Sequence, residues 1–328
     1  MAKMYYQDDA DLSVIQDRAI GVIGYGSQGH AHSLNLKDSG LNVTVGLYEG
    51  SKSWAKAEEQ GLEVGIVADV ARDSDIIMML IPDTAMAEVY KESIEPHMTP
   101  GDMLMFAHGF NIHYKTIVPP STIDVSMVAP KAPGHRMREV FTKGSGVPGL
   151  LAISQDVSGN ARRIGLAYAR GVGCTRAGVL DTTFAEETET DLFGEQAVLC
   201  GGLSELIVRG FGTLVEAGYQ PEVAYFECMH EVKLIVDLLH EGGLKKMHEF
   251  VSEAAKYGDL TQGPRVVDDH TGERMKEVLK DIQDGTFAKN WVSEYDAGLP
   301  EYNRLLEEDL HSQIETVGKE LRGRMSWL

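Results

Sequence analysis

The first half of the chain alternates short apolar runs with segments of helical periodicity. Helical segments include His30–Lys37 and Trp54–Gln60. Apolar strands separated by helices are typical of βαβ units, whose strands run parallel. The pattern therefore predicts an α/β domain with a doubly wound, mainly parallel sheet. The runs that fit its buried strands are Arg18–Ile23, Asn42–Leu47, Asp75–Leu80, Met103–Ala107, Val125–Val128 and Leu150–Ser154.

The pattern changes after about Thr183, where strand-like runs stop. We place a domain boundary near Asp181–Thr183 and expect an N-terminal domain over residues 1–182 and an all-helical domain over residues 183–328. Two domains suit this length, at roughly 100–200 residues per domain. The helical segments expected in the second domain are Asp191–Ala217, Pro221–Glu241, Leu244–Tyr257, Thr271–Asp284 and Leu299–Leu321.

Charge and composition restrict the partners. The 328 residues carry a formal net charge of −20, and an acidic surface repels nucleic acid and anionic membranes while attracting metal cations. No uninterrupted apolar run approaches the ~18 residues of a membrane span, and the polar N-terminus does not resemble a signal peptide. The three cysteines are odd in number and lack CxxC spacing, which suits a reducing cytoplasm. We expect a cytoplasmic protein with no nucleic-acid or membrane partner.

A glycine-rich turn, Gly24-Tyr25-Gly26-Ser27-Gln28-Gly29, follows the first strand and precedes a helix. In such a turn the first glycine permits the tight bend, the second lets the backbone approach a pyrophosphate, and the third lets helix and strand pack closely. The helix N-terminus then offers N–H groups to the phosphates. The context predicts a Rossmann domain that binds a dinucleotide.

The residues after the second strand bear on the choice between NAD and NADP. Glu49 lies 20 residues after Gly29, where a carboxylate would accept the ribose 2′-hydroxyl of NAD. Ser51, Lys52 and Ser53 offer hydrogen bonds and charge to a 2′-phosphate instead. The two signals conflict, and the loop as a whole favours NADH or the use of both cofactors.

Two pairs of carboxylates are spaced by one helical turn in the second half. Asp191 and Glu195 are four residues apart, and so are Glu227 and Glu231, so each pair shares a helix face. In so acidic a chain, a solvated face is the simplest interpretation. Each pair, however, continues into an apolar stripe, where ionised carboxylates are costly unless paired or bound to metal. Oxygen ligands suit Mg²⁺ or Mn²⁺ rather than zinc.

Three polar side chains follow predicted strands. His108 comes after Met103–Ala107, Lys131 comes after the strand of residues 125–128, and Asp83 comes after that of residues 75–80. Open parallel sheets bind ligands at the carboxyl ends of their strands. His108 is suited to proton transfer near neutral pH, and Lys131 to orienting carboxylates or neutralising an anion. A structural loop histidine and a surface lysine remain the alternative interpretations.

The chain resembles the ketol-acid reductoisomerases of the short, class I type. The matching stretches are specific, occur in order and span most of the chain. They read GYGSQGHAHSLNLKDSG at 24–40, FAHGF at 106–110, APKAPGH at 129–135, ETETDLFGEQAVLCGG at 187–202 and EAGYQPEVAYFECMHEVKLIVDLLHEGG at 216–243.

The resemblance implies a fold and a reaction. The fold is a Rossmann domain followed by an all-helical, knotted domain. The reaction rearranges 2-acetolactate or 2-aceto-2-hydroxybutyrate by Mg²⁺-dependent alkyl migration and reduces the product to a 2,3-dihydroxy acid, in branched-chain amino-acid synthesis. Such chemistry needs a metal-activated hydroxyl and a polarised carbonyl, which two metals can supply together. Short members pair their helical domains, so the resemblance also implies at least a homodimer.

The resemblance assigns roles to particular residues. Asp191 would bridge two Mg²⁺ ions, Glu195 would complete the first site, and Glu227 and Glu231 would serve the second, with Glu231 also able to take a proton. His108 matches the active-site histidine, and Lys131 belongs to the matching APKAPGH stretch. Ser252 matches the serine that contacts substrate. In the implied dimer, Ser252, Glu227 and Glu231 would reach into the partner's active site. Many relatives have arginine at position 48, so Tyr48 with Glu49 puts strict NADPH dependence in doubt. Further positions that match cofactor contacts are Tyr25, Gly26, Ser27, Gln28, Ser51, Ser53, Asp83, Thr84, Ala85, Met86 and Gly134. Gly24 and Gly29 are expected at the cofactor from the glycine-rich turn itself.

Two other functions remain open from the residues. A metal-independent Rossmann dehydrogenase of a 3-hydroxy acid would use a lysine as its acid and base and would not need carboxylates on apolar stripes. A dinucleotide-binding sensor would bind the cofactor without turning over an acyloin substrate.

Overall fold

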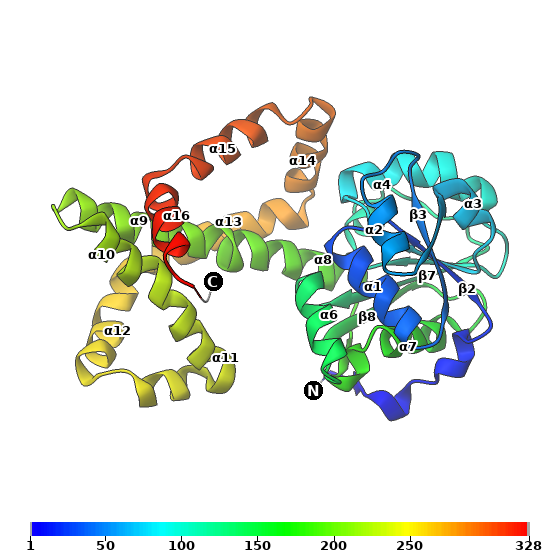
Figure 1. Cartoon of the computed structure of the whole chain (residues 1–328), viewed down its shortest axis with the longest axis horizontal. Coiled ribbons are helices and arrows are strands. Elements are labelled where there is room, and N and C mark those ends of the chain that lie inside the picture. The colour runs from blue at the N-terminus through cyan, green and yellow to red at the C-terminus, as the bar shows by residue number, and fades with distance from the viewer. Residues whose placement is uncertain (1, 327–328) are drawn as a thin grey trace. The chain divides into compact units, whose positions relative to one another are not determined.

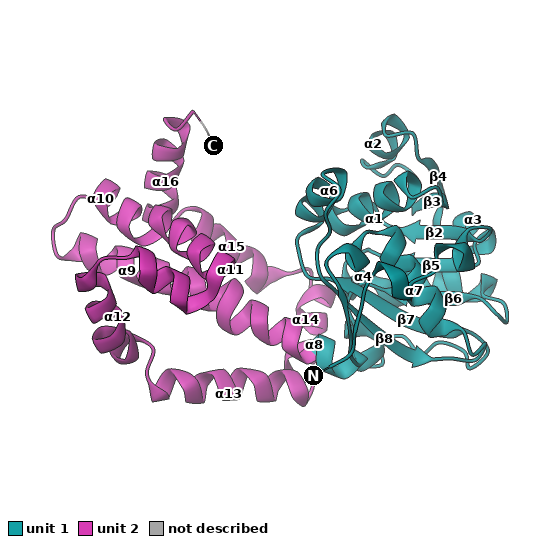
Figure 2. Cartoon of the chain, turned by 90° about the horizontal axis from the view of Figure 1, so that it is seen from below, with its two compact units in different colours: residues 1–188 teal, residues 189–328 magenta. Residues whose placement is uncertain are grey.

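The computed structural model describes residues 2–326 and divides the chain into two compact units, Met1–Thr188 and Glu189–Leu328 (Figure 2). The division falls inside helix α8 (Phe184–Phe193), which begins in the first unit. The first unit is built on a sheet and the second consists of helices (Figure 1). The predicted fold class, an α/β domain with a mainly parallel sheet followed by a helical region, is confirmed.

Nine strands form one sheet in the order β1-β9-β8-β7-β6-β5-β2-β3-β4. Six neighbouring strands, β7-β6-β5-β2-β3-β4, pair in parallel, as βαβ units require. The strands are β1 (Met4–Tyr5), β2 (Ala19–Ile23), β3 (Asn42–Leu47), β4 (Glu63–Ile66), β5 (Ile76–Met79), β6 (Met103–Phe106), β7 (Asp124–Pro130), β8 (Gly149–Gln155) and β9 (Val179–Asp181).

Three strands were not predicted, and one runs in an unexpected direction. β4 reads Glu-Val-Gly-Ile at the sheet edge, and β1 and β9 are only two and three residues long, so none shows an apolar run. Strand β8 pairs antiparallel with β7, which is an exception within the mainly parallel sheet that was predicted. An apolar run predicts that a strand is buried but does not predict its direction in the sheet.

Both faces of the sheet are buried. Along β5, Ile76 and Met78 belong to one core cluster, whereas Ile77 and Met79 belong to the other. This alternation explains why β5 is a continuous apolar run rather than an alternating one. The helices of this unit are α1 (Ser27–Asp38), α2 (Trp54–Glu59), α3 (Val67–Arg72), α4 (Asp83–Val89), α5 (Phe110–His113), α6 (Gly134–Thr142) and α7 (Ala161–Gly171).

The helical unit is more divided than the sequence predicts. The expected helix over residues 299–321 is two helices, the one over 244–257 breaks at Val251–Ser252, and α14 was missed. Two π-helical turns interrupt the long helices. The elements are η6 (Gly194–Leu199), α9 (Gly201–Glu216), α10 (Pro221–Tyr225), η7 (Phe226–His230), α11 (Glu231–Phe250), α12 (Glu253–Val266), α13 (Asp269–Gln283), α14 (Thr286–Asp296), α15 (Pro300–Leu310) and α16 (Gln313–Gly323).

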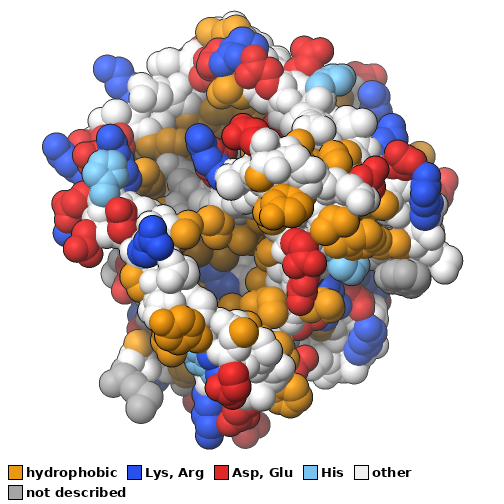
Figure 3. All heavy atoms as spheres, turned by 90° about the vertical axis from the view of Figure 1, so that its left-hand side faces the viewer, with side chains coloured by type: hydrophobic (Ala, Val, Ile, Leu, Met, Phe, Trp, Pro, Cys, Tyr) orange, Lys and Arg blue, Asp and Glu red, His pale blue; other side chains and the backbone are white. Residues whose placement is uncertain are grey.

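The core of the helical unit is small, and many of its apolar side chains are exposed. A cluster around Ile207, Phe211 and Tyr225 is buried, whereas Leu199, Leu234 and other large side chains along the same helices stay open to solvent. Figure 3 looks onto this unit and shows hydrophobic side chains at its surface. The continuous helical stretch Phe184–Glu216 is even long and apolar enough to span a membrane by length and composition, with 11% of its most apolar window buried. The sequence expectation counted only uninterrupted apolar runs and did not register it.

Candidate functional site: the ends of strands β6 and β7

His108 and Lys131 lie at the same edge of the sheet. Strands β6 and β7 pair in parallel, with Phe106 opposite Met127, so the loops after both strands leave at that edge. Lys131 directly follows β7, and its main-chain N–H donates to the carbonyl of Pro148 at 2.8 Å. The predicted placement of both side chains at carboxyl ends of parallel strands therefore agrees with the topology.

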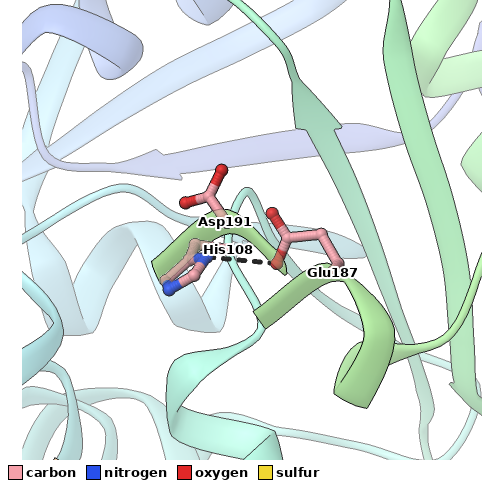
Figure 4. Close-up of side chains that lie close together, drawn as sticks. All are labelled: His108, Glu187 and Asp191. Carbon is pink, nitrogen blue, oxygen red and sulfur yellow. Dashed lines mark hydrogen bonds and ion pairs between the residues drawn. The ribbon is translucent and has the colours of Figure 1, made fainter. Parts of the chain in front are cut away.

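A buried carboxylate that the sequence analysis overlooked, Glu187, joins these two residues. Its side chain is 1% exposed and comes from the first turns of α8. The Oε1 atom accepts a hydrogen bond from Lys131 Nζ at 2.7 Å, and Oε2 accepts from His108 Nδ1 at 3.1 Å and from the Gly109 N–H at 3.0 Å. An ionised carboxylate only accepts, so His108 presents a protonated Nδ1 to it. Figure 4 shows the contact between His108 and Glu187.

Opposing effects determine the ionisation of Glu187. Burial alone raises the pKa of this carboxyl, because it removes water from the charged form. The hydrogen bond and charge of His108, with the charge and hydrogen bond of Lys131, outweigh burial and hold the pKa of Glu187 below its usual value. The carboxylate is therefore charged at neutral pH, and it holds the side chains of Lys131 and His108 in place at the strand ends.

Helix α8 is held against the sheet by aromatic packing. The ring of Phe184, at the start of α8, packs edge-on against that of Phe106 on β6, with centroids 6.4 Å apart. Both rings belong to the same buried cluster. This contact brings the acidic stretch of α8 to the end of β6, where Glu187 meets His108.

One predicted metal ligand joins this cluster. Asp191 lies one turn after Glu187 on α8, and one ligand atom from each of His108, Glu187 and Asp191 lies within 4.8 Å of the others. The three side chains are drawn together in Figure 4. Carboxylate oxygens are the ligands that Mg²⁺ prefers, so Asp191, the half-buried carboxylate of this cluster, fits a divalent cation.

The other predicted ligands are not gathered into a comparable cluster among the described residues. Glu195 lies in the π-helical turn η6, Glu227 lies in η7, and Glu231 begins α11; all three are exposed. Both pairs were predicted from regular α-helical spacing, and the structure places at least one member of each in a π-helical turn. Single π-helical turns inside helices often occur at functional sites. Ser252 is likewise exposed and caps α12, where its hydroxyl accepts from the Ala255 N–H.

The glycine-rich turn has the predicted surroundings. Gly24 has φ of +103°, and a Cβ there would lie 2.5 Å from the Leu80 carbonyl oxygen, so the bend at the end of β2 requires glycine. A Cβ on Gly26, in contrast, would meet no atom within 4 Å. The fold itself therefore does not need glycine at position 26, which is consistent with space kept for a ligand.

The loop that carries Lys131 packs directly on this turn. A Cβ on Gly134 would lie 1.9 Å from the Ser27 carbonyl oxygen, and Gln28 Nε2 donates to the Ala132 carbonyl at 2.9 Å. The backbone of the glycine-rich turn is therefore packed tightly against the loop that carries Lys131. A pocket of about 400 Å³ opens beside the turn, between α1, α2 and the start of α6.

The remaining predicted cofactor residues lie at neighbouring strand ends. Tyr48 and Glu49 follow β3 and are exposed, as are parts of the loop to Ser53. Residues 83–86, with Thr84 and Ala85 between Asp83 and Met86, form the first turns of α4. Asn111 Nδ2 donates to the Asp83 carbonyl at 3.1 Å, and Met86 is buried in the core, where it contacts the same amide.

Two family models together cover almost the whole chain. Residues 14–178 match the acetohydroxy acid isomeroreductase NADPH-binding domain, and residues 184–327 match the ketol-acid reductoisomerase C-terminal domain. A solved structure described as an NADH-preferring ketol-acid reductoisomerase from an uncultured archean is 47% identical, with a TM-score of 0.96 over 99% of both chains. The chain belongs to the ketol-acid reductoisomerase family.

More distant structures share the fold alone. A semialdehyde dehydrogenase NAD-binding protein from Cupriavidus necator is 16% identical, with a TM-score of 0.63 over 82% of this chain and 99% of that one. A pyrroline-5-carboxylate reductase from Coxiella burnetii is 12% identical, with a TM-score of 0.56 over 81% and 98%. Ketol-acid reductoisomerases therefore share their architecture with dehydrogenases of other substrates.

Family membership confirms the predicted enzyme class. The chain is an NAD(P)H-dependent oxidoreductase with an isomerase step, as ketol-acid reductoisomerases are. The two alternatives, a metal-independent 3-hydroxy acid dehydrogenase and a non-enzymatic sensor, are set aside because the similarity covers both units rather than the Rossmann domain alone. The signal that could have revealed Glu187 is its spacing of four residues from Asp191 in the stretch Glu187-Thr188-Glu189-Thr190-Asp191.

Proposed function

We propose that this ketol-acid reductoisomerase converts 2-acetolactate and 2-aceto-2-hydroxybutyrate by Mg²⁺-dependent alkyl migration and then reduces the product to a 2,3-dihydroxy-3-methyl acid. The observation that carries the proposal is the cluster at the ends of β6 and β7, where Glu187 binds Lys131 and His108 beside Asp191. The cluster joins Asp191, the carboxylate that we assign to Mg²⁺, to the strand ends beside the glycine-rich turn. A plain dehydrogenase would not need Asp191 there.

Asp191 and Glu195 would hold one Mg²⁺, and Glu227 and Glu231, together with Asp191, would hold a second. Bound Mg²⁺ supplies polarisation of the substrate hydroxyl and carbonyl oxygens. Glu187 is assigned to positioning instead, because its two oxygens already accept three hydrogen bonds from the protein. The net charge of −20 is then compatible with an anionic substrate, because the metals counter its charge.

The protein's own side chains bind the substrate and transfer its protons. Glu231 accepts the proton of the substrate hydroxyl during migration. Lys131 and His108, held by Glu187, orient the substrate oxygens and return a proton at the reduction step. Ser252 contacts the substrate through its exposed hydroxyl. Bound NADH or NADPH would supply the hydride.

The cofactor binds along the glycine-rich turn, from Tyr25 to Gln28, and the loop from Tyr48 to Ser53. We infer that NADH is used, alone or together with NADPH. Glu49 is exposed at the end of β3, where it can accept a ribose hydroxyl and repel a 2′-phosphate. A structure 47% identical to this chain is described as NADH-preferring, which supports the same inference.

Self-association is part of the proposal. Leu199, Leu234 and Leu244 are 66%, 51% and 68% exposed, and such apolar surface on long helices is costly in water. A second copy packed on the helical unit would cover it and bring Glu227, Glu231 and Ser252 to the partner's cluster. We expect a homodimer or larger assembly in the cytoplasm, where the free Cys174, Cys200 and Cys228 stay reduced.

The test is oxidation of NADH and of NADPH with racemic 2-acetolactate, followed by nicotinamide absorbance, with Mg²⁺ and then with EDTA. We expect turnover that requires Mg²⁺ and proceeds with NADH. Turnover that survives EDTA, or no turnover with either cofactor, would contradict the proposed chemistry. Light scattering on the same sample reports the mass: a monomer would contradict the shared site.

A further inference from the structure

The pocket beside the glycine-rich turn contains a cation that has no assigned role. Its walls include Tyr25 and Ser27 from the turn and Ser53 and Lys56 from α2 and its N-cap. Among the described residues that line this pocket, Lys56 is the only lysine or arginine. Lys52, which lies in the predicted specificity loop, is not among the residues that line the pocket.

The path of a dinucleotide explains which of its groups would reach Lys56. A pyrophosphate on the turn at Gly26 and Ser27 directs the adenine ribose towards the end of β3, because the Rossmann fold binds the ribose there. Ser53 occupies the N-cap position of α2, and Lys56 lies three residues later, so both side chains face the same side of the helix. We therefore expect the ribose 2′ position to lie near Ser53 and Lys56, which both line the pocket.

The charges around the pocket discriminate between the two cofactors. Glu49, which is exposed after β3, can accept a hydrogen bond from a 2′-hydroxyl but repels a 2′-phosphate. Glu59, which lines the pocket, adds to that repulsion. A phosphate monoester carries about −1.5 to −2 charges at pH 7 and needs a cation beside it. Lys56, which also lines the pocket, can supply that charge.

We propose that Lys56 is a specificity-determining residue that binds the 2′-phosphate of NADPH, with Ser53 donating a hydrogen bond, and so maintains NADPH binding against Glu49 and Glu59. The proposal rests on the cofactor site proposed above. Lys56 contributes little to NADH, which has no phosphate at this position. The ratio of the two affinities is therefore governed by α2 as well as by the loop that precedes it.

The experiment measures the Kd of NADH and of NADPH from the change in nicotinamide fluorescence on binding, for the full-length protein and its variants. We expect Lys56→Gln to raise the Kd of NADPH about tenfold and that of NADH less than about twofold, as loss of one charge-assisted hydrogen bond implies. Lys56→Arg should keep NADPH binding within about threefold of the original, since the charge remains. The salt dependence of NADPH binding should also weaken in Lys56→Gln.

Lys52→Gln tests the neighbouring loop lysine separately, and Lys91→Gln is the matched control, because it removes the same charge from an exposed lysine outside the pocket. It should leave both constants within about twofold, whereas Glu59→Gln should tighten NADPH about twofold to threefold. As a second probe, 2′-AMP should displace NADH less well from Lys56→Gln than from the original protein, while 5′-AMP should displace it equally from both.

Three results would overturn the assignment. Equal weakening of NADH and NADPH in Lys56→Gln would place Lys56 on the shared pyrophosphate, and an unchanged NADPH constant would remove it from the site. A larger NADPH effect in Lys52→Gln than in Lys56→Gln would move the role to the loop. If the original protein bound neither cofactor, the proposed cofactor site itself would be wrong, which distinguishes that failure from a misplaced lysine.

Discussion

The ammonium of Lys131 lies 2.7 Å from Oε1 of Glu187, a carboxylate that is 1% exposed. The two residues are 56 positions apart in sequence: Lys131 comes before strands β8 and β9, and Glu187 comes after them. Because His108 donates to the other oxygen, this one carboxylate sets the orientation of both polar side chains at the strand ends. The predictions that follow begin with this pair.

Glu187→Gln should lower kcat about 100-fold, the usual size of an effect on positioned acid–base groups. The amide has no charge for Lys131 and cannot accept at both positions, so the orientation of Lys131 and His108 is lost. NADH affinity should stay within about twofold, since the glycine-rich turn is untouched. Steady-state kinetics and fluorescence titration measure the two quantities.

Glu186→Gln is the control for this variant, because Glu186 is the exposed neighbour on the same helix. It should leave kcat unchanged within about twofold. Calorimetry should accompany the kinetics, because removing one member of a buried ion pair can cost about 3–5 kcal/mol of stability. A folded Glu187→Gln protein with unaltered kcat would show that Glu187 has no positioning role.

Glu227→Gln should abolish the isomerisation and weaken Mg²⁺ binding at least about tenfold, because a metal site loses one anionic ligand. Dinucleotide affinity should remain nearly intact. Titration calorimetry with Mg²⁺ and fluorescence titration with NADH separate the two effects. Glu222→Gln, an exposed change on the preceding helix α10, should alter neither. Equal loss of metal and dinucleotide binding would contradict the division into two sites.

Gly134→Ala and Gly26→Ala should affect the protein in opposite ways. A Cβ on Gly134 meets the Ser27 backbone at 1.9 Å, so this variant should lose about 1–3 kcal/mol of stability. A Cβ on Gly26 meets nothing within 4 Å, so Gly26→Ala should keep its Tm but bind NADH at least about tenfold more weakly, since the methyl group occupies the pyrophosphate path. A lowered Tm for Gly26→Ala with normal NADH affinity would contradict the ligand role.

His32 should make the unfolding free energy depend on pH. Its ring is fully buried against the Tyr168 hydroxyl at 2.9 Å, and burial lowers its pKa to about 3. Between the unfolded value of about 6.5 and this folded value, the unfolded chain binds one more proton, so stability falls as pH falls. The loss is about 1.4 kcal/mol per pH unit from this residue.

Urea unfolding at pH 7, 6 and 5 measures this dependence, and His32→Gln supplies the comparison. The variant should be less stable at pH 7, because Gln fits the buried site poorly, but its stability should fall less steeply below pH 6. Parallel curves for the two proteins would show that His32 is not the group that titrates.

Several features of this protein follow from the sequence alone, because they depend on neighbours along the chain. Apolar runs separated by helical periods predict a parallel α/β sheet, and the glycine-rich turn after β2 predicts where the dinucleotide binds. Spacing of four residues predicts that Asp191 and Glu195, and Glu227 and Glu231, share helix faces, but the π-helical turns η6 and η7 that hold Glu195 and Glu227 were not predicted. The order of the motifs identifies the family, and the comparisons confirm it.

Other features exist only in the tertiary structure, because they depend on which elements meet. The antiparallel direction of β8 cannot be derived from its apolar run, which records burial of both faces and not orientation. The period of a helix likewise shows which residues share a face but not what that face contacts. Glu187 looked like one acid among several, and only the packing of α8 on β6 buries it between Lys131 and His108, 56 and 79 residues away.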